Sequence, residues 1–218
     1  MALHLARDAG LRTTDSRLDR VADNDVLLVT RFDGDVTDQG VRRIPYLSAM
    51  SMLGAVDGER RSYVEIADAL RAHGAAATHD LAELWRRIVF SVLISNTDDH
   101  LRNHGFLYAG LAGWRLSPVF DVNPVPTDIK DRLLSTAIGV DGDPTASLDI
   151  ALEVATQFGL KAADAKRIAA EVGAATSRWN TVAARFGIAS SEIERMRSAF
   201  EDEDSRAAAV LRPARHRG

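Results

Sequence analysis

Cysteine is absent from the 218 residues of this chain. Its absence excludes disulfide bonds, zinc sites built on cysteine and thiol nucleophiles. No apolar run reaches the roughly 18 residues that a membrane-spanning helix needs, and the first residues lack the pattern of a secretory signal peptide. We therefore expect a soluble cytoplasmic protein that does not contact a membrane.

Lysine is scarce, and positive charge is not in excess. Of the 27 basic residues only three are lysines, namely Lys130, Lys161 and Lys166, and the formal net charge is −4. Because no global basic field is present, we expect no direct binding of nucleic acid. The part of the chain before Lys130 contains neither a lysine nor a glycine-rich phosphate loop.

A buried helix is predicted in the middle of the chain. Apolar side chains recur there at helical period, at Leu81, Leu84, Trp85, Ile88, Val89, Val92 and Leu93. This spacing gives one wide apolar face over residues 81–93. Asp80 directly precedes the face, so we expect its carboxylate to cap the N-terminus of the helix.

Polar residues follow this helix at once, over residues 95–100. Polar groups that adjoin a core must be paired or used. Asp98 and Asn103 lie five residues apart, the spacing of the protein-kinase catalytic loop, where the Asp accepts the proton of the substrate hydroxyl and the Asn binds Mg²⁺. Asp99 is only four residues from Asn103, so Asp98 is the better candidate base.

A hairpin is predicted next, because two short apolar runs at 105–108 and 114–116 surround a glycine-containing turn. A hairpin returns the chain towards its start, so Asp121 is expected to come back towards Asn103. In kinases an Asp that follows the catalytic loop is the second metal ligand. Asp121, with an apolar residue on each side, is the candidate for that position.

Each of these residues has a plainer interpretation on its own. The two aspartates at 98 and 99 could belong to a turn, the histidines could be ordinary loop residues, and Asp121 could begin the turn into the following Asn-Pro. A metal-dependent phosphoesterase is another possibility, because Asp and His clusters can hold metals. Its candidate ligands are Asp98, Asp99, His100, His104 and Asp121.

The rest of the pattern predicts an α+β, mostly helical fold with a short β segment near the N-terminus. A helix over 2–9 should end at Gly10, and Asp33-Gly34 reads as a hairpin turn between strands. Residues 201–218 are predicted to form a flexible tail. The other predicted elements are strands at 26–32, 40–44 and 133–140, and helices at 45–53, 63–72, 147–158, 161–172, 174–186 and 191–200, the last capped by Ser191.

Two motifs closely resemble the HipA-like kinases, the toxin components of HipA/HipB-type toxin–antitoxin pairs. They are NTDDHLRN at 96–103 and LSPVFD at 116–121, and the segments 31–33 and 46–63 are also similar. The resemblance runs from residue 3 to about residue 200. It implies a kinase-like C-terminal lobe that uses ATP and Mg²⁺ to phosphorylate serine or threonine of a protein substrate, with a HipB-like antitoxin as a partner.

The resemblance also assigns residues by position. It implies Asp98 and His100 as catalytic residues and Asn103 and Asp121 as Mg²⁺ ligands. It further implies a strand whose backbone meets the adenine at Thr30 and Phe32, with Asp33 near the ribose.

The chain departs from the family by lacking the phosphate loop and the ATP-contacting lysine of an N-terminal lobe. We therefore interpret residues 1–44 as a remnant of the N-lobe and hinge, and 45–200 as the helical C-lobe. Two hypotheses remain open. The chain is a kinase lobe that works with an N-lobe from another chain or a longer product, or it is a catalytically dead, kinase-like module that binds an antitoxin or another partner.

Overall fold

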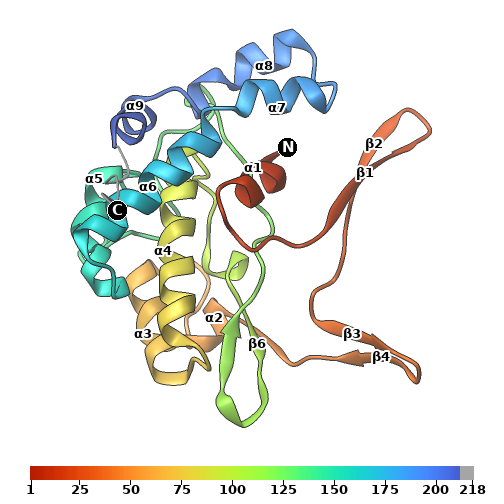
Figure 1. Cartoon of the computed structure of the whole chain (residues 1–218), viewed down its shortest axis with the longest axis vertical. Helices are drawn as coiled ribbons and strands as arrows, with labels where there is room; N and C mark the ends of the chain where they lie inside the picture. The colour runs from red at the N-terminus through yellow and green to blue at the C-terminus, as the bar shows by residue number, and fades with distance from the viewer. Residues whose placement is uncertain (212–218) are drawn as a thin grey trace, which may run out of the picture.

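A helical body and two projecting β-hairpins make up the computed structural model, which describes residues 1–211 (Figure 1). The body is organised around α4 (Ala77–Leu93), which packs against α3 (Tyr63–His73), α5 (Leu148–Glu153) and α6 (Ala162–Thr176). The strands form small antiparallel sheets. The predicted α+β, mostly helical fold is confirmed.

The apolar face of α4 is buried as its period predicts, and Leu84, Trp85 and Ile88 are fully inaccessible. The helix begins four residues earlier than expected, with Ala76 as its N-cap. The prediction that Asp80 caps it is therefore wrong. Asp80 is buried in the first turn, and its carboxylate accepts hydrogen bonds from Arg115 Nε at 2.8 Å and from the backbone N–H of Leu116 at 2.9 Å.

Further helices complete the body. Helix α1 ends before Gly10, which has a φ of 79°, as the sequence predicts. Leu5 and Ala6 of α1 are fully buried and join the core against α6 and α7. The remaining α-helices are α1 (Ala2–Asp8), α2 (Ala49–Met52), α7 (Trp179–Arg185), α8 (Ser190–Met196) and α9 (Glu203–Val210), and 3-10 helices cover Leu101–Asn103, Gly110–Ala112, Val154–Phe158 and Arg197–Ala199.

Three sheets are present in residues 1–211. Two are the projecting hairpins, and the third lies beside α3 and α4 and contains the predicted hairpin of residues 105–116. Gly105 is required there, because a Cβ at this position would lie 2.2 Å from the ring of Tyr46. The sheets are β1 (Ser16–Val21) with β2 (Asn24–Val29), β3 (Gly34–Thr37) with β4 (Gly40–Arg43), and β5 (Tyr46–Ser48) with β6 (Gly105–Tyr108) and β7 (Trp114–Leu116).

Strand β2 ends at Val29, so residues 30–32 are not part of a strand as predicted, and the predicted pairing of residues 26–32 with 40–44 through a turn at Asp33-Gly34 is also wrong. Strand β2 pairs with β1, and β4 pairs with β3, so each strand takes the partner that is nearest along the chain. The helix predicted at 45–53 is half strand, since β5 pairs with β6 before α2 begins. The predicted strand at 133–140 is irregular and makes only isolated bridges.

The C-terminal part differs from the prediction at its element boundaries. Helix α8 has Ala189 as its N-cap, so Ser191 is not the cap. Residues 203–210 form helix α9 on the surface of α6, where a flexible tail was expected. The carboxylate of Asp202 caps α9 by accepting the backbone N–H of Ser205 at 2.8 Å. The rest of the predicted tail, residues 212–218, lies outside the described residues.

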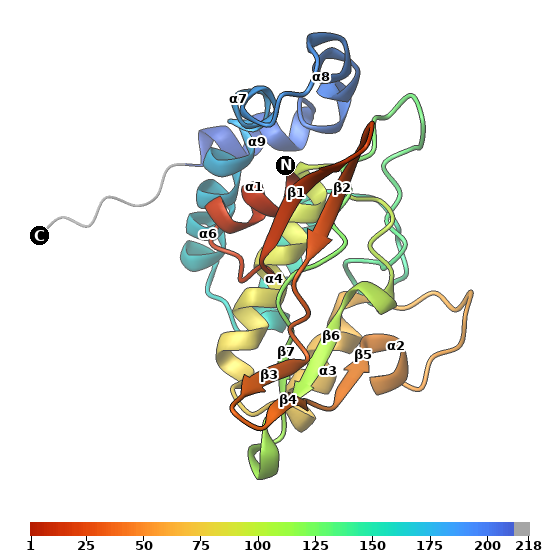
Figure 2. The same cartoon turned by 90° about the vertical axis from the view of Figure 1, so that its right-hand side faces the viewer.

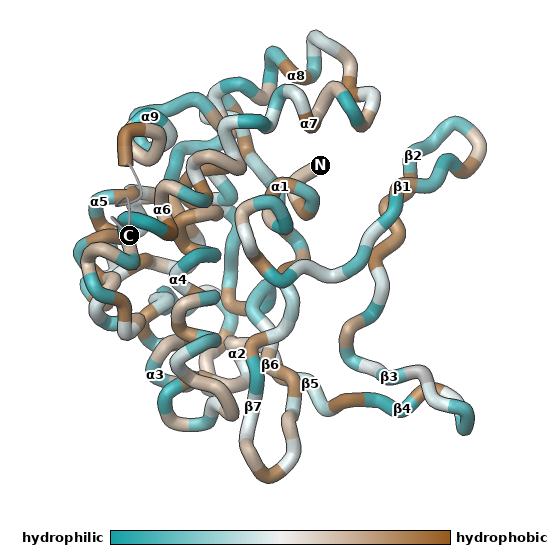
Figure 3. Tube along the Cα trace, viewed as in Figure 1, coloured by the Kyte–Doolittle hydropathy of each residue, from teal (hydrophilic) through white to brown (hydrophobic). Residues whose placement is uncertain are grey.

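The two hairpins stand away from the body, with β1–β2 above β3–β4 in the turned view of Figure 2. Hydrophilic and hydrophobic residues both occur along them (Figure 3), and Leu18 and Leu27 are about half exposed. Among residues 1–211, none of the helices combines the length and the apolar character that crossing a bilayer requires.

Candidate active site

The loop that follows α4 brings the predicted base and the first predicted metal ligand together. Asn103 Nδ2 donates to the backbone oxygen of Asp98 at 3.3 Å, so the two ends of the D-x-x-x-x-N motif are directly linked. The Asp98 side chain is 69% exposed, whereas Asn103 is buried. A base at the surface can meet a hydroxyl group of another protein, and a buried ligand is held in one place.

Asp99 has the opposite environment, because its side chain is buried in a polar network. Its carboxylate accepts hydrogen bonds from the hydroxyl of Tyr63 and from Ser91 Oγ, the latter at 3.1 Å, and His104 Nε2 lies 3.1 Å from its other oxygen. Burial alone would raise the pKa of Asp99, but the nearby charge of His104 and the two hydroxyl donors hold that pKa below its ordinary value. The network fixes the catalytic loop to α3 and α4.

Asp121 is joined to the catalytic loop through its neighbours. The backbone N–H of Asn123 donates to Asn96 Oδ1 at 3.1 Å, and that of Val125 donates to the carbonyl of Ser95 at the same distance. Asp121 itself has a φ of 53° and Ser95 a φ of 50°. Such left-handed backbone is uncommon for residues other than glycine and clusters at functional sites.

The donor atoms of Asn103 and Asp121 suit Mg²⁺, which prefers oxygen ligands and is commonly bound by one or two carboxylates together with substrate phosphates. Among residues 1–211, Asn103 Oδ1 accepts no hydrogen bond, and Asp121 accepts one, on Oδ1 from Asn123 Nδ2 at 2.9 Å. Oxygen atoms on both side chains are therefore available to a cation.

The cluster that a metal-dependent phosphoesterase would need does not form. Within the described residues, no three His, Asp or Glu side chains come together as a metal-binding group. Asp99 and His104 are engaged with each other inside the core, while Asp98 is exposed. This interpretation of the sequence therefore has no support in the structure.

His100 occupies the turn between Asp98 and Asn103. Its backbone N–H donates to the carbonyl of Asp98 and its carbonyl accepts from the N–H of Asn103, each at 2.9 Å. Its Nδ1 is buried and has no hydrogen-bond partner among residues 1–211. The side chain lines none of the three cavities described below, so its catalytic role stays a prediction.

Thr30, Phe32 and Asp33 line one cavity of about 340 Å³, at the base of the hairpins. The N–H and carbonyl of Thr30 are already bonded, to the carbonyl of Asp15 at 2.8 Å and to Thr14 Oγ1 at 2.6 Å. Arg31 Nε donates to the Asp33 carboxylate at 2.9 Å, and this hydrogen bond lowers the pKa of Asp33. A ribose at Asp33 would thus share the carboxylate with Arg31.

Phe120 lies between residues 30–33, which carry the predicted nucleotide contacts, and the candidate metal ligands. It lines the cavity of Thr30, Phe32 and Asp33, a second cavity of about 460 Å³ that includes Asp121, and a small hollow that includes Asn103. The rings of Phe32 and Phe120 pack with their centroids 5.4 Å apart. The hollows around the predicted nucleotide and metal residues therefore meet at one side chain.

Three residues of this arrangement were missed from the sequence, and each acts by positioning a neighbour. Asn96 holds the Asp121 segment, Asp99 holds the catalytic loop, and Thr14 connects the two halves of the site. Thr14 is buried, its Oγ1 donates to the carbonyl of Thr30, and its N–H donates to the carbonyl of Val119 at 3.2 Å. Only Asn96 and Asp99 had a signal, because both lie in the polar run that follows the apolar face.

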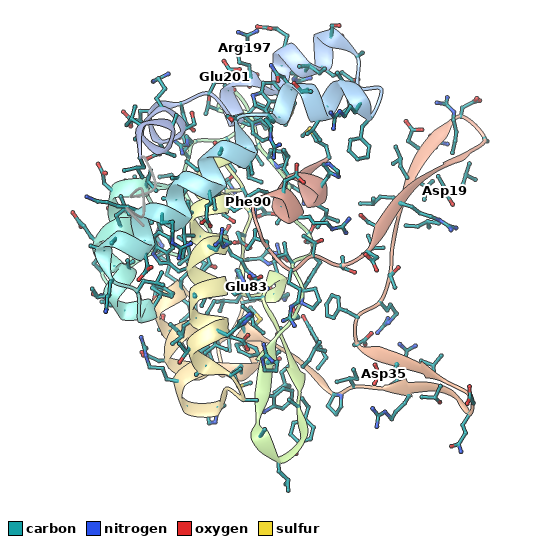
Figure 4. All side chains as sticks on the ribbon, in the orientation of Figure 1. Asp19, Asp35, Glu83, Phe90, Arg197 and Glu201 are labelled. Atoms are coloured by element: carbon teal, nitrogen blue, oxygen red, sulfur yellow. The ribbon has the colours of Figure 1, made fainter. Side chains whose placement is uncertain are left out.

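The segment that leads to Asp121 rests on a buried ion pair of α4. Arg87 Nη2 lies 3.2 Å from Glu83 Oε1 and donates to the carbonyl of Ser117 at 2.5 Å. Glu83 Oε1 also accepts the backbone N–H of Arg12 at 3.2 Å. Figure 4 labels Glu83 and Phe90 on α4, within the body, and Asp19 and Asp35 on the hairpins.

Known proteins resemble this chain in sequence. The model of the HipA-like C-terminal domain matches residues 1–179. A Haemophilus influenzae protein named "Putative kinase" is 29% identical over 141 residues, which is 61% of this chain and 40% of that protein. A Sinorhizobium fredii protein named "Putative kinase Y4dM" is 40% identical over 73 residues, which is 34% of this chain and 15% of that protein.

Two solved structures share the fold. The HipA of Shewanella oneidensis, solved with HipB and operator DNA, superposes with a TM-score of 0.66 at 17% identity, over 95% of this chain and 50% of that chain. The proinflammatory kinase CtkA of Helicobacter pylori gives a TM-score of 0.60 at 16% identity, over 95% of this chain and 81% of that chain. The chain spans half or less of the HipA and the H. influenzae protein. It belongs to the family of HipA-like C-terminal domains.

Proposed function

We propose that this chain is the C-terminal lobe of a HipA-like serine/threonine kinase, which transfers the γ-phosphoryl group of Mg-ATP to a hydroxyl of a protein. The observation that carries the proposal is the junction of Asp98, Asn103 and Asp121. Asn103 and Asp121 lie on two loops that are hydrogen-bonded to each other and line hollows that meet at Phe120, and Asn103 is hydrogen-bonded to the carbonyl of Asp98. Reaction of a protein hydroxyl suits a base as exposed as Asp98.

In this proposal the Asp98 carboxylate accepts the hydroxyl proton as the hydroxyl oxygen bonds to the γ-phosphorus. The bond from that phosphorus to the oxygen bridging to the β-phosphate breaks, and ADP leaves. Asn103 and Asp121 would hold Mg²⁺, which supplies positive charge to the phosphate oxygens. Thr30, Phe32 and Asp33 would line the nucleoside end, with the backbone of Phe32 better placed for adenine than that of Thr30, which is already bonded.

The lobe is proposed to be incomplete without an N-lobe, from another chain or a longer product. Kinase catalysis depends on positioning and on stabilising charge, and a lysine that contacts the ATP phosphates contributes much of it. This chain has no lysine before Lys130. A HipB-like antitoxin is proposed as a partner, by analogy with the HipA that was solved with HipB. We place such a toxin-related kinase in the cytoplasm.

The same scarcity of lysine favours a second candidate, a kinase-like module that binds its partner and transfers nothing. Transfer from γ-³²P-labelled ATP to a protein separates the two. We expect no transfer by the chain alone, and transfer when the N-terminal half of a HipA-like kinase is added in trans. The Asp98→Asn variant, which keeps the loop backbone, should abolish this transfer. Transfer that persists in the variant would contradict the role of Asp98, and nucleotide binding without any transfer would favour the binding module.

A further inference from the structure

The side chain of one lysine, Lys130, lies near the candidate base Asp98. Lys130 belongs to a segment outside the two sequence motifs. Lys130 Nζ lies 4.0 Å from Asp98 Oδ1 and 3.5 Å from the carbonyl oxygen of Thr97. Among residues 1–211, no other basic side chain lies within ion-pair distance of Asp98. Lys130 is also the first lysine of the chain.

The segment that carries Lys130 is held against the catalytic loop at both ends. Before the lysine, the backbone N–H of Val125 donates to the carbonyl of Ser95 at 3.1 Å. After it, Ser135 donates to the carbonyl of Thr97 twice, from its N–H at 3.1 Å and from its Oγ at 3.0 Å. The lysine itself sits in a turn, because its N–H donates to the carbonyl of Pro126 at 3.2 Å. The backbone at Lys130 is therefore anchored, while its side chain is 44% exposed.

Neighbouring arginines are committed to other partners. Arg102, within the catalytic loop, pairs with Asp57 at 2.9 Å. Arg132, two residues after Lys130, lies 2.8 Å from Asp204 and 3.1 Å from Asp202, and also donates to the carbonyl of Val92. Lys130 is thus the cation near Asp98 that has room to take a further anionic partner. An exposed pair such as Lys130–Asp98 contributes little to stability, so stability gives no reason for this placement.

We infer that Lys130 is a catalytic residue that contacts the γ-phosphoryl group of ATP. The inference rests on the proposed kinase function. A base that takes the proton of the attacking hydroxyl must stand next to the phosphorus that the hydroxyl attacks, so an ammonium group 4.0 Å from that base is within reach of the γ-phosphoryl oxygens. An ammonium group is a compact charge with three donors on a flexible stem and suits this role. Lys130 would thereby supply, from the C-lobe, positive charge on the transferred group.

The test compares two nucleotides, because ADP lacks the γ-phosphoryl group. Mg-ATP and Mg-ADP are each titrated calorimetrically into the full chain and into Lys130→Met, Lys130→Arg and Lys166→Met. A charge-assisted contact of ordinary strength predicts that Lys130→Met weakens Mg-ATP about tenfold or more and Mg-ADP less than about twofold. Lys130→Arg should recover part of the loss, since it keeps the charge. Lys166, on the exposed side of α6, is the matched control and should leave both affinities unchanged.

The outcomes separate this inference from the proposed function. If the full chain binds both nucleotides and Lys130→Met keeps the same ratio of the two affinities, Lys130 does not contact the γ-phosphoryl group, while the kinase proposal stands. The ratio is also unchanged if Lys130→Met weakens the binding of both nucleotides by the same factor, so that result leads to the same conclusion. If the unaltered chain binds neither nucleotide even with the N-terminal half of a HipA-like kinase added, the proposed function fails and the inference about Lys130 fails with it.

Discussion

The helical body holds the predicted catalytic loop among buried side chains, whereas the predicted nucleotide residues Thr30, Phe32 and Asp33 lie on the segment between the two projecting hairpins. In the body, Asn96, Asp99 and Asn103 are all at least nine-tenths buried. In the hairpins, Leu18, Leu27 and Val29 are each at least two-fifths exposed. The residues proposed for metal and proton chemistry are therefore positioned by a core, whereas the predicted nucleotide residues lie between two hairpins with exposed side chains.

The difference suggests how the two halves of the site tolerate change. Buried side chains of the body are held by packing and by hydrogen bonds, so substitutions at these positions should lower the stability of the fold before they change binding. Side chains of the hairpins should change binding with little effect on stability. Asp98 is the exception in the body, because it belongs to the buried loop but faces solvent.

The two neighbouring aspartates should give the largest contrast. Asp99→Ala leaves the hydroxyls of Tyr63 and Ser91 and the ring of His104 without their buried partner, so we expect the free energy of unfolding to fall by about 3–5 kcal/mol. Asp98→Ala removes an exposed carboxylate, so the free energy of unfolding should change by no more than about 0.5 kcal/mol. Urea unfolding followed by circular dichroism measures both. Equal losses of unfolding free energy in the two variants would contradict the expected difference between the buried and the exposed aspartate.

A buried leucine of the body and an exposed leucine of a hairpin allow the two regions to be compared without a change of charge. Leu84 on α4 is fully buried, and Leu27 on β2 is 56% exposed. Leu84→Ala should lower the free energy of unfolding by about 2–5 kcal/mol, and Leu27→Ala by no more than about 0.5 kcal/mol. If Leu27→Ala proved as costly as Leu84→Ala in the same urea assay, the hairpin would have to be packed more tightly than the structure indicates.

Acid should weaken the body through Asp99. A carboxyl group whose pKa is lowered by folding stabilises the folded state above the unfolded pKa of about 4, and this contribution disappears as the pH falls through the lowered folded pKa. The difference in unfolding free energy between the unaltered chain and Asp99→Asn should therefore be full at neutral pH and shrink below about pH 4. Urea unfolding at a series of pH values measures it. A difference that stays constant down to pH 2 would show that folding does not lower the pKa of Asp99.

The smallest effect on stability concerns Thr14, which joins the two regions. Thr14→Val removes the hydroxyl that donates to the carbonyl of Thr30 and should cost about 1 kcal/mol. Because that bond positions the segment of Phe32 and Asp33 between the two hairpins, the affinity for Mg-ATP should fall as well. Thr13→Val, at the neighbouring position, is the control and should not change nucleotide affinity. A Thr14→Val protein with unaltered affinity would show that the two regions are not coupled through this residue.

Local patterns were sufficient to predict the elements of the body. The helical period of residues 81–93 and the glycine turn of the 105–116 hairpin both act over a few residues, and α4 and this hairpin are observed. The spacing of Asp98 and Asn103 likewise identified the loop that links them.

The sequence-based predictions failed where contacts with residues far away in the sequence determine the local structure. Asp80 looks like a cap in the sequence, but Arg115, 35 residues away, draws it into a buried pair. Residues 46–48 form a strand because β6 lies beside them. Nothing local distinguishes buried Asp99 from exposed Asp98, and only the positions of Tyr63 and His104 in space do so.

The most direct test of the account is the binding of ATP with and without Mg²⁺, measured by calorimetry on the full chain and on Asp121→Asn. The substitution removes a charge from an exposed position, so the fold should be unaffected. We predict that the full chain binds ATP and binds it more tightly with Mg²⁺, and that Asp121→Asn loses the part that depends on Mg²⁺. If the variant keeps the same Mg²⁺ dependence, or the full chain binds no nucleotide even with the N-terminal half of a HipA-like kinase added, the assignment of this site to Mg-ATP is wrong.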